Sequence, residues 1–236
     1  MKLKSFGCSF VFGSDLNDCQ AEKGIPIFQK NIINNGYSLS TWPALLAKKF
    51  ELDYECYAWP AMGNFYILER ILSAIEEDET DIFVINWTWI DRFCYIKDEE
   101  KIWSPEGWVS ILPSDDDKNS KFYYQNLHSQ FRDKLESLIC IKSAIDALTQ
   151  KNQKFIMTYV DELLWEKNYH FNESIRLLQD SVDPYVSRFE GMSFFDWAKH
   201  KQFKISDRWH PLEEAHQAAS KYMVPQVETC IKQLNI

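Results

Sequence analysis

The pattern of hydrophobic and polar residues predicts strands that alternate with helices along the chain. Five short and largely apolar runs have the length of buried strands, at residues 3–8, 53–59, 81–87, 154–160 and 192–197. Between these runs apolar residues recur every three or four positions, most clearly over residues 129–150. Right-handed crossover helices must lie on the faces of a parallel sheet. We therefore expect an α/β protein, a three-layer α/β/α sandwich with a central parallel sheet of about five strands.

Two long polar segments interrupt this alternation, at residues 14–38 and 92–128. A long loop in a compact domain usually serves a function. The second segment is an insertion after the third expected strand, and it would overhang the carboxyl ends of the strands. We expect a lid or substrate-binding insertion, with an oligomer contact or a solvated excursion as alternatives. No linker or internal repeat divides the chain, so residues 1–236 are expected to form a single domain.

The first expected strand runs into Gly7-Cys8-Ser9, a sharp turn that carries a serine. Ligands of α/β proteins bind at the carboxyl ends of parallel strands. Ser9 is therefore placed where chemistry is usually done. The alternative is a turn-forming serine whose hydroxyl bonds to the local backbone.

Near the other end of the chain, Asp207 lies three residues before His210, which is followed by Pro211. Proline suits the first turn of a helix, so Asp207 and His210 are expected in the loop that leads into the last helix. Such a loop can return the carboxylate to one imidazole nitrogen and leave the other nitrogen facing a hydroxyl, as a Ser-His-Asp triad requires. The alternative is that Asp207 caps the helix and His210 lies on the surface.

These two blocks together resemble the SGNH (GDSL-like) hydrolases, which have a nucleophilic serine in a G-x-S turn and a D-x-x-H-P block near the C-terminus. Gly7-Cys8-Ser9 and Asp207–Pro211 match both blocks in type, spacing and position. The resemblance implies a serine ester hydrolase for acetyl or short acyl esters, often of carbohydrates. Ser9 would attack, His210 would act as base, Asp207 would orient it, and no cofactor would be needed.

The family also places a glycine and an asparagine in the middle of the chain as oxyanion donors. Gly63 and Asn64 lie at the expected start of a helix, where backbone N–H groups are free to receive negative charge. The resemblance therefore assigns oxyanion donors to the backbone of Ser9 and Gly63. The alternative is that Gly63 eases a turn and Asn64 caps the helix.

The third family block, usually G-x-N-D, departs from the pattern because Ile90 stands where the asparagine should be. Asn86, Thr88 or Asn64 could supply the missing donor. Without a full set of donors, the alternative function is a non-catalytic binding module with the same fold. A second alternative is acyl transfer by the same triad.

Trp103 and Trp108 in the insertion are the expected substrate-binding residues, because an aromatic face stacks well on a sugar or a flat acyl group. The resemblance implies a small-molecule or carbohydrate ester as the substrate. The net charge of −9 argues against nucleic acid as a partner, since phosphate contacts need clustered Lys and Arg. The sequence does not indicate an oligomeric state.

Six cysteines show neither C-x-x-C pairs nor metal-ligand spacing, so we expect reduced thiols and no metal. No apolar run reaches the roughly 20 residues of a membrane span, and the first residues run straight into a strand. These features predict a cytoplasmic protein without a membrane partner. Four other histidines are expected to be structural or exposed: His128, His170, His200 and His216.

Overall fold

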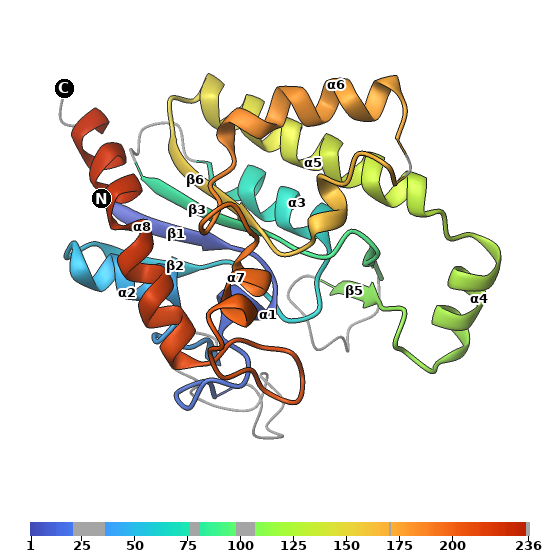
Figure 1. Ribbon diagram of the computed structural model, residues 1–236, viewed down its shortest axis with the longest axis horizontal. Helices are drawn as coiled ribbons and strands as arrows, with labels where there is room; N and C mark the ends of the chain where they lie inside the picture. Colours follow the sequence, from blue (N-terminus) through green and yellow to red (C-terminus); the bar gives the residue numbers. More distant parts are fainter. Residues whose placement is uncertain (21–35, 76–80, 98–106, 170, 235–236) are drawn as a thin grey trace.

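A computed structural model describes residues 1–20, 36–75, 81–97, 107–169 and 171–234. Its centre is a parallel sheet of four strands in the order β2-β1-β3-β6 (Figure 1). The strands are β1 (Lys2–Phe6), β2 (Asp53–Cys56), β3 (Ile82–Trp87) and β6 (Lys154–Tyr159). The α/β fold class is confirmed, with one strand fewer than expected.

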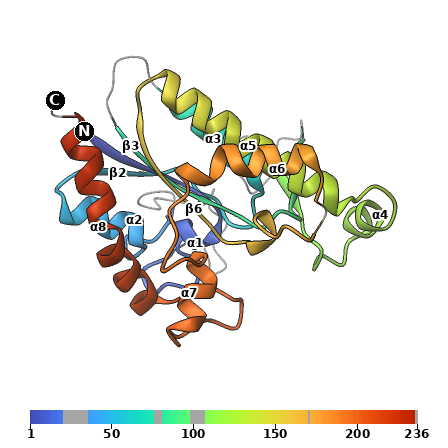
Figure 2. The ribbon, with the colours of Figure 1, turned by 45° about the horizontal axis from the view of Figure 1, so that its top comes forward.

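Helices cover both faces of this sheet (Figure 2). One layer holds α2 (Trp42–Lys49), α7 (Phe194–His200) and α8 (Glu213–Leu234), and the other holds α3 (Asn64–Ala74), α5 (Gln130–Gln150) and α6 (Glu173–Val182). Side chains alternate along β3, so Ile82 and Val84 pack into the first layer while Phe83 and Ile85 pack into the second. A fully buried β3 explains why its sequence is continuously apolar.

Shorter elements complete the described chain. They are α1 (Ser9–Phe12), β4 (Phe93–Ile96), β5 (Trp108–Ile111), α4 (Lys118–Asn126) and the 3₁₀ helices η3 (Glu162–Leu164) and η4 (Asp183–Tyr185). Strands β4 and β5 pair antiparallel as a separate hairpin. No helix among the described residues is both long and apolar enough to cross a membrane.

The expected fifth strand at residues 192–197 is wrong, because this segment begins α7. The Ser193 side chain accepts a hydrogen bond from the Asp196 N–H and so caps the start of the helix. Phe194, Trp197 and Ala198 then share one buried face at helical spacing. A short aromatic run is ambiguous between strand and helix, and the serine cap is the signal that decided it.

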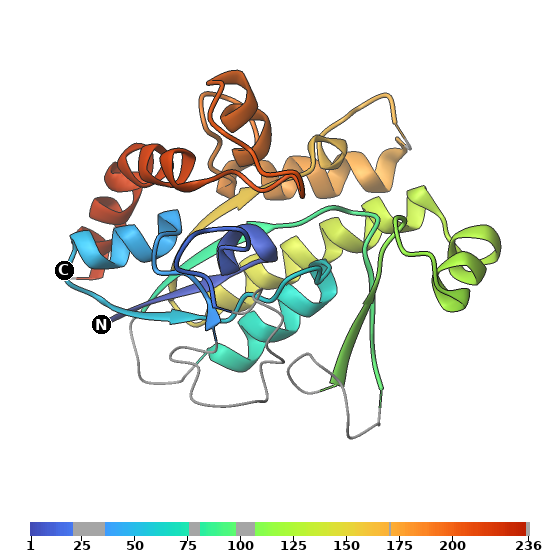
Figure 3. The ribbon, with the colours of Figure 1, turned by 90° about the horizontal axis from the view of Figure 1, so that it is seen from below.

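The described part of the insertion packs on the α3 side of the sheet. In Figure 3 the β4–β5 hairpin lies on that side, and the loop that carries His210 lies on the other side with α7 and α8. Trp108 is 1% exposed and packs edge-on against Phe65 and Tyr66 of α3. Its expected role in stacking on a substrate is therefore corrected to a role in the core. Trp103 lies outside the described residues, and the lid role of the insertion stays a prediction.

Candidate active site

The turn after β1 places Ser9 at the first position of α1. Gly7 is required there, because a Cβ at this position would lie 2.6 Å from Val11 Cγ2 and 3.0 Å from the Asn86 carbonyl oxygen. At the other end of α1, Gly13 adopts the left-handed conformation that stops the helix after one turn. Ser9 is 5% exposed, and its hydroxyl makes one long contact of 3.9 Å to Cys8 Sγ.

The first two N–H groups of α1 make no hydrogen bond to any residue that the structure describes. The N–H groups of Val11 and Phe12 both donate to the Cys8 carbonyl, whereas those of Ser9 and Phe10 have no acceptor among the described residues. The first N–H groups of a helix have no partner inside it. The Ser9 turn therefore presents free backbone donors beside a hydroxyl.

His210 is held by a carboxylate from the opposite end of the chain. Its Nδ1 lies 2.7 Å from Asp15 Oδ2, and both side chains are largely buried, with 13% and 12% exposed. The same Asp15 oxygen accepts a hydrogen bond of 2.6 Å from Ser206 Oγ, and its other oxygen pairs with the Arg208 guanidinium. Asp15 thus anchors the loop that presents His210.

Ser206 also shapes the backbone of this loop. Its Oγ accepts hydrogen bonds from the N–H of Arg208 at 3.2 Å and from that of His210 at 3.1 Å. Between them, Trp209 has a φ of 66°, a left-handed conformation that is costly for a bulky residue. The bonds to Ser206 hold the loop in this tight conformation.

The expected pairing of Asp207 with His210 does not occur in this structure. Asp207 lies at the exposed tip of the Ser206 turn and makes no hydrogen bond or ion pair with any described residue. Asp15 takes the position expected for it. In the sequence, the signal for Asp15 is its place just after the Gly13 turn, six residues beyond Ser9. In the structure, Asp15 has a φ of 68°, which Asp tolerates better than most residues.

Phe10 joins the two ends of the chain at the carboxyl edge of the sheet. Its ring packs edge-on against His210, with centroids 5.6 Å apart. Because Phe10 follows Ser9 directly, this contact places the imidazole beside the Ser9 turn. The Ser9 hydroxyl does not hydrogen-bond to His210 in this structure, a bond that often tightens only when substrate is bound.

The Gly63 N–H, expected to be an oxyanion donor, is already engaged. It donates to Cys94 Sγ at 2.9 Å, and a Cβ at Gly63 would lie 2.6 Å from the Arg92 carbonyl oxygen. Burial raises the pKa of the Cys94 thiol, which keeps the sulfur neutral. Gly63 therefore serves the close approach of the hairpin to α3.

Asn64 is engaged as well. Its Oδ1 accepts from the Thr88 N–H at 2.8 Å, and its Nδ2 donates to the Thr88 carbonyl at 3.3 Å and to Ser137 Oγ at 2.9 Å. The side chain is 4% exposed. Asn64 thus ties α3 and α5 to the end of β3, and its side-chain amide has no N–H left for a substrate.

Asn86 and Thr88 keep unused donors. Both are fully buried, and neither Asn86 Nδ2 nor the Thr88 hydroxyl has a partner among the described residues. Asn86 Oδ1 accepts from Thr158 Oγ1 at 2.8 Å. By strand alternation Asn86 faces the same side as Val84, which is the side of α7 and α8 and of the His210 loop. Asn86 is the expected donor that best suits this site.

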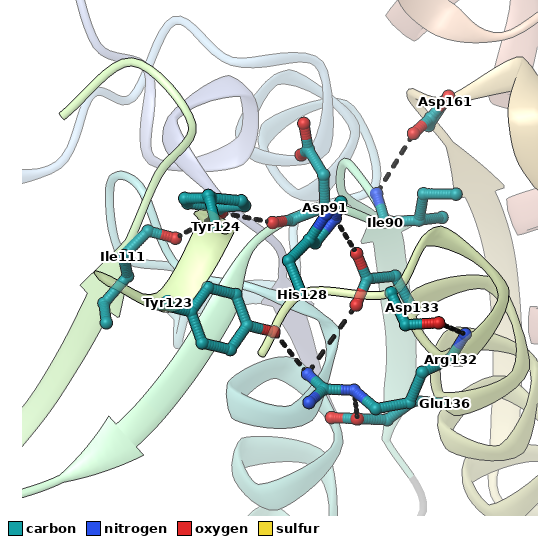
Figure 4. Close-up of polar contacts among 11 residues, drawn as sticks. Ile90, Asp91, Ile111, Tyr123, Tyr124, His128, Arg132, Asp133, Glu136 and Asp161 are labelled. Atoms are coloured by element: carbon teal, nitrogen blue, oxygen red, sulfur yellow. Dashed lines mark hydrogen bonds and ion pairs between the residues drawn. The ribbon is translucent and has the colours of Figure 1, made fainter. Parts of the chain in front are cut away.

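The segment that follows β3 is fixed by contacts from two other elements (Figure 4). The Ile90 N–H donates to Asp161 Oδ2 at 3.0 Å, just beyond the end of β6. On its other side, the Tyr124 hydroxyl bridges the carbonyls of Asp91 at 2.6 Å and Ile111 at 3.0 Å. The insertion therefore holds the end of β3 in place.

A charged network joins α4 to α5 in the same region (Figure 4). Asp133 contacts His128 Nε2 at 2.8 Å and the Arg132 guanidinium at 3.6 Å, and Arg132 also packs over the Phe93 ring. Burial raises the pKa of Asp133. No cluster of potential metal ligands occurs among the residues that the model describes. This network supports the insertion and lies apart from His210.

Comparison with known proteins identifies the fold. No family model and no curated protein matches the chain. Among solved structures it is similar to the psychrotrophic esterase EstA from Pseudoalteromonas sp., with 11% identity over 98% of both chains and a TM-score of 0.50.

Two further structures are similar. One is a carbohydrate esterase, with 12% identity over 96% of this chain and 68% of that chain and a TM-score of 0.53. The other is TesA, with 12% identity, coverage of 98% and 99%, and a TM-score of 0.52. The fold is therefore the α/β fold that the resemblance to the SGNH hydrolases implies.

Proposed function

We propose that this protein is a serine ester hydrolase in which Ser9 is the nucleophile, His210 the base and Asp15 the orienting carboxylate. The observation that carries the proposal is the 2.7 Å contact from His210 Nδ1 to Asp15, made beside the Ser9 turn. It leaves His210 Nε2 without a partner among the described residues, available to take a proton. Asp15 replaces Asp207 in the triad expected from the sequence.

The reaction follows from these positions. Ser9 Oγ attacks the acyl carbonyl while its proton passes to His210 Nε2, and Asp15 stabilises the imidazolium and fixes its tautomer. The proton then passes to the leaving alcohol. Water enters with His210 again as base and releases the acid. Ser206 and Arg208 hold the Asp15 carboxylate in place during both steps.

The developing oxyanion needs donors that are not already engaged. The Ser9 N–H has no acceptor in the described part of the chain, and Asn86 Nδ2 is a buried donor on the same side of the sheet. Such donors stabilise charge well because they are already oriented, and losing one typically costs about 10²–10³ in turnover. We assign Ser9 and Asn86 to this role in place of Gly63 and Asn64.

Acetyl or short acyl esters, including esters of carbohydrates, are the proposed substrates. The similarity in fold to two esterases, one of them a carbohydrate esterase, supports this choice.

Labelling by a fluorophosphonate probe tests the nucleophile. Wild-type protein is expected to be labelled and Ser9→Ala is expected not to be, whereas the exposed Ser114→Ala serves as the matched control and is expected to label as wild type. Labelling that persists in Ser9→Ala would exclude Ser9. A folded wild type that is not labelled at all would favour a non-catalytic binding module of the same fold.

A further inference from the structure

A row of three aromatic side chains runs from the His210 loop to the end of β3. Trp209 contacts Phe195 of α7 with ring centroids 6.2 Å apart, and Phe195 contacts Trp89 at 5.7 Å. Phe195 also packs 5.8 Å from Phe10, the residue that follows Ser9. We call Trp209, Phe195 and Trp89 the aromatic row. It begins next to the proposed base and leads away from it.

A cleft of about 350 Å³ lies at the Trp89 end of the row. Its apolar lining comes from Trp89, Phe195, Val160 and Leu163. Trp89 follows β3 and Val160 follows β6, so the cleft opens at the carboxyl ends of these neighbouring strands. This is the edge of the sheet where ligands of α/β proteins bind, and it also carries Ser9.

The polar lining of the cleft is acidic. Glu166 and Asp196 contribute carboxylates, and Lys199, which pairs with Asp196 at 3.4 Å, is the cation among the lining residues. Glu162 lines the cleft as well, but its oxygens accept from the Tyr159 hydroxyl and the Ser193 N–H. Asp161 also lines the cleft, but its two oxygens accept N–H groups from Ile90 and Leu163. An excess of carboxylates repels anionic ligands and offers acceptors to hydroxyl groups. An apolar face next to hydroxyl acceptors suits a sugar ring.

The two tryptophans of the row are fixed in place. Trp89 precedes Ile90, whose N–H is bonded to Asp161, and the Tyr124 hydroxyl holds the Asp91 carbonyl (Figure 4). Trp209 is 66% exposed although its backbone is in the costly left-handed conformation. Burial of the indole does not explain this arrangement. Strained residues of this kind concentrate where a ligand is bound.

We propose that the aromatic row and its cleft bind the sugar part of the ester substrate, with neutral sugars preferred over sugars that carry carboxylates. This inference rests on the proposed function for its position beside Ser9 and His210, but it can be tested by binding alone. Sugar rings stack on Trp209 and Trp89, and a sugar hydroxyl group donates to Glu166. Substrate preference then depends on α7, η3 and the end of β3 rather than on Trp108.

Binding is measured in the Ser9→Ala background, where no turnover occurs. Tetramers of xylose and of galacturonic acid serve as the neutral and acidic probes, followed by tryptophan fluorescence and calorimetry. The neutral tetramer is expected to bind saturably and the acidic tetramer at least about tenfold more weakly. The difference in affinity between the two tetramers is expected to become smaller in 0.5 M salt (roughly a 4 Å screening length), because salt screens the carboxylates of the cleft.

Variants of the row locate the site. Trp89→Ala and Trp209→Asn are expected each to weaken binding of the neutral tetramer by about tenfold. Asn is chosen for position 209 because it tolerates the left-handed backbone. Trp209→Phe keeps an aromatic face and is expected to restore most of the affinity. Phe122→Ala removes a comparably exposed aromatic ring from α4 and is the matched control, with no expected change.

Two results would overturn the inference. In the first, folded Ser9→Ala protein does not bind the neutral tetramer saturably. In the second, the changes at Trp89 and Trp209 leave the affinity of Ser9→Ala protein for the neutral tetramer unchanged. Hydrolysis of p-nitrophenyl acetate by the wild type reports separately on the proposed function. Sugar binding without hydrolysis would reject the esterase and keep the site, and hydrolysis without sugar binding would do the reverse.

Discussion

Two histidines six residues apart differ in the group that faces each imidazole. His210 is 13% exposed at its side chain, with Nδ1 on the Asp15 carboxylate and Nε2 without a partner among the described residues. His216 is 1% exposed, and its Nδ1 accepts a hydrogen bond of 3.1 Å from the Trp42 N–H. Both rings pack against phenylalanine, so aromatic packing does not distinguish them.

The difference lies in which group faces Nδ1. A carboxylate opposite Nδ1 accepts the N–H of that nitrogen and leaves the lone pair on Nε2, as a general base requires. An N–H opposite Nδ1 uses the lone pair and favours the neutral ring. Burial lowers the pKa of His216 to about 3, partly offset by the Pro211 backbone and Asp18. His210 is the base in the proposed reaction, whereas His216 joins α8 to α2.

Removing the negative charge that faces His210 is expected to reduce activity more than any other change considered. Asp15→Asn is expected to lower kcat/KM for p-nitrophenyl acetate by about 10³–10⁴, because the amide no longer stabilises the correct tautomer or the imidazolium. Steady-state kinetics measure the loss. Circular dichroism checks that the fold is kept.

Asp207→Asn is the matched control for Asp15→Asn. Asp207 is exposed and makes no polar contact with a described residue, so its variant is expected to stay within about threefold of wild type. A severe loss in Asp207→Asn with little loss in Asp15→Asn would return the triad to the arrangement expected from the sequence.

The second prediction concerns the loss of protein stability at low pH that follows from keeping His216 neutral. The unfolded chain binds a proton at His216 below pH 6.5, whereas the folded protein does so only near pH 3. The contribution of His216 to stability is thus complete above pH 6.5 and falls as pH decreases, by about 1.4 kcal/mol per pH unit. Urea unfolding at pH 7.5, 6.0 and 5.0 measures this loss.

His216→Gln is the control, because Gln can accept the Trp42 N–H without binding a proton. The difference in unfolding free energy between wild type and His216→Gln is expected to shrink by about 2 kcal/mol from pH 6.5 to pH 5, from the slope of 1.4 kcal/mol per unit. A difference that stays constant with pH would mean that His216 is not kept neutral by the fold.

The smallest expected effect concerns Arg208. Its side chain is 60% exposed where it pairs with Asp15. Exposed ion pairs contribute under about 1 kcal/mol, so Arg208→Ala is expected to lower kcat/KM by less than about fivefold. A loss as large as that of Asp15→Asn would assign Arg208 a direct part in the reaction. Activity at low and high salt measures the electrostatic share.

Local sequence patterns predicted much of the architecture. The four parallel strands lie where apolar runs of strand length predicted them, and α5 follows its helical periodicity. The exception at residues 192–197 arose because a run of aromatic residues fits either period, and only the Ser193 cap favours the helix. The sequence also predicted that Gly63 and Asn64 lie at the start of a helix. It did not predict that their polar groups bond to Cys94, Thr88 and Ser137.

Turn residues and periodicity act over a few neighbouring positions, so they were enough to predict Ser9 at the end of the first strand and His210 before the last helix. The carboxylate that faces His210 depends on how distant segments pack. Asp207 is near His210 in the chain, but the Ser206 turn leaves its side chain exposed, while Asp15, far away in the sequence, meets the imidazole. The aromatic row is likewise built from three separate segments. Contacts of this kind depend on how distant elements pack, which local spacing does not encode.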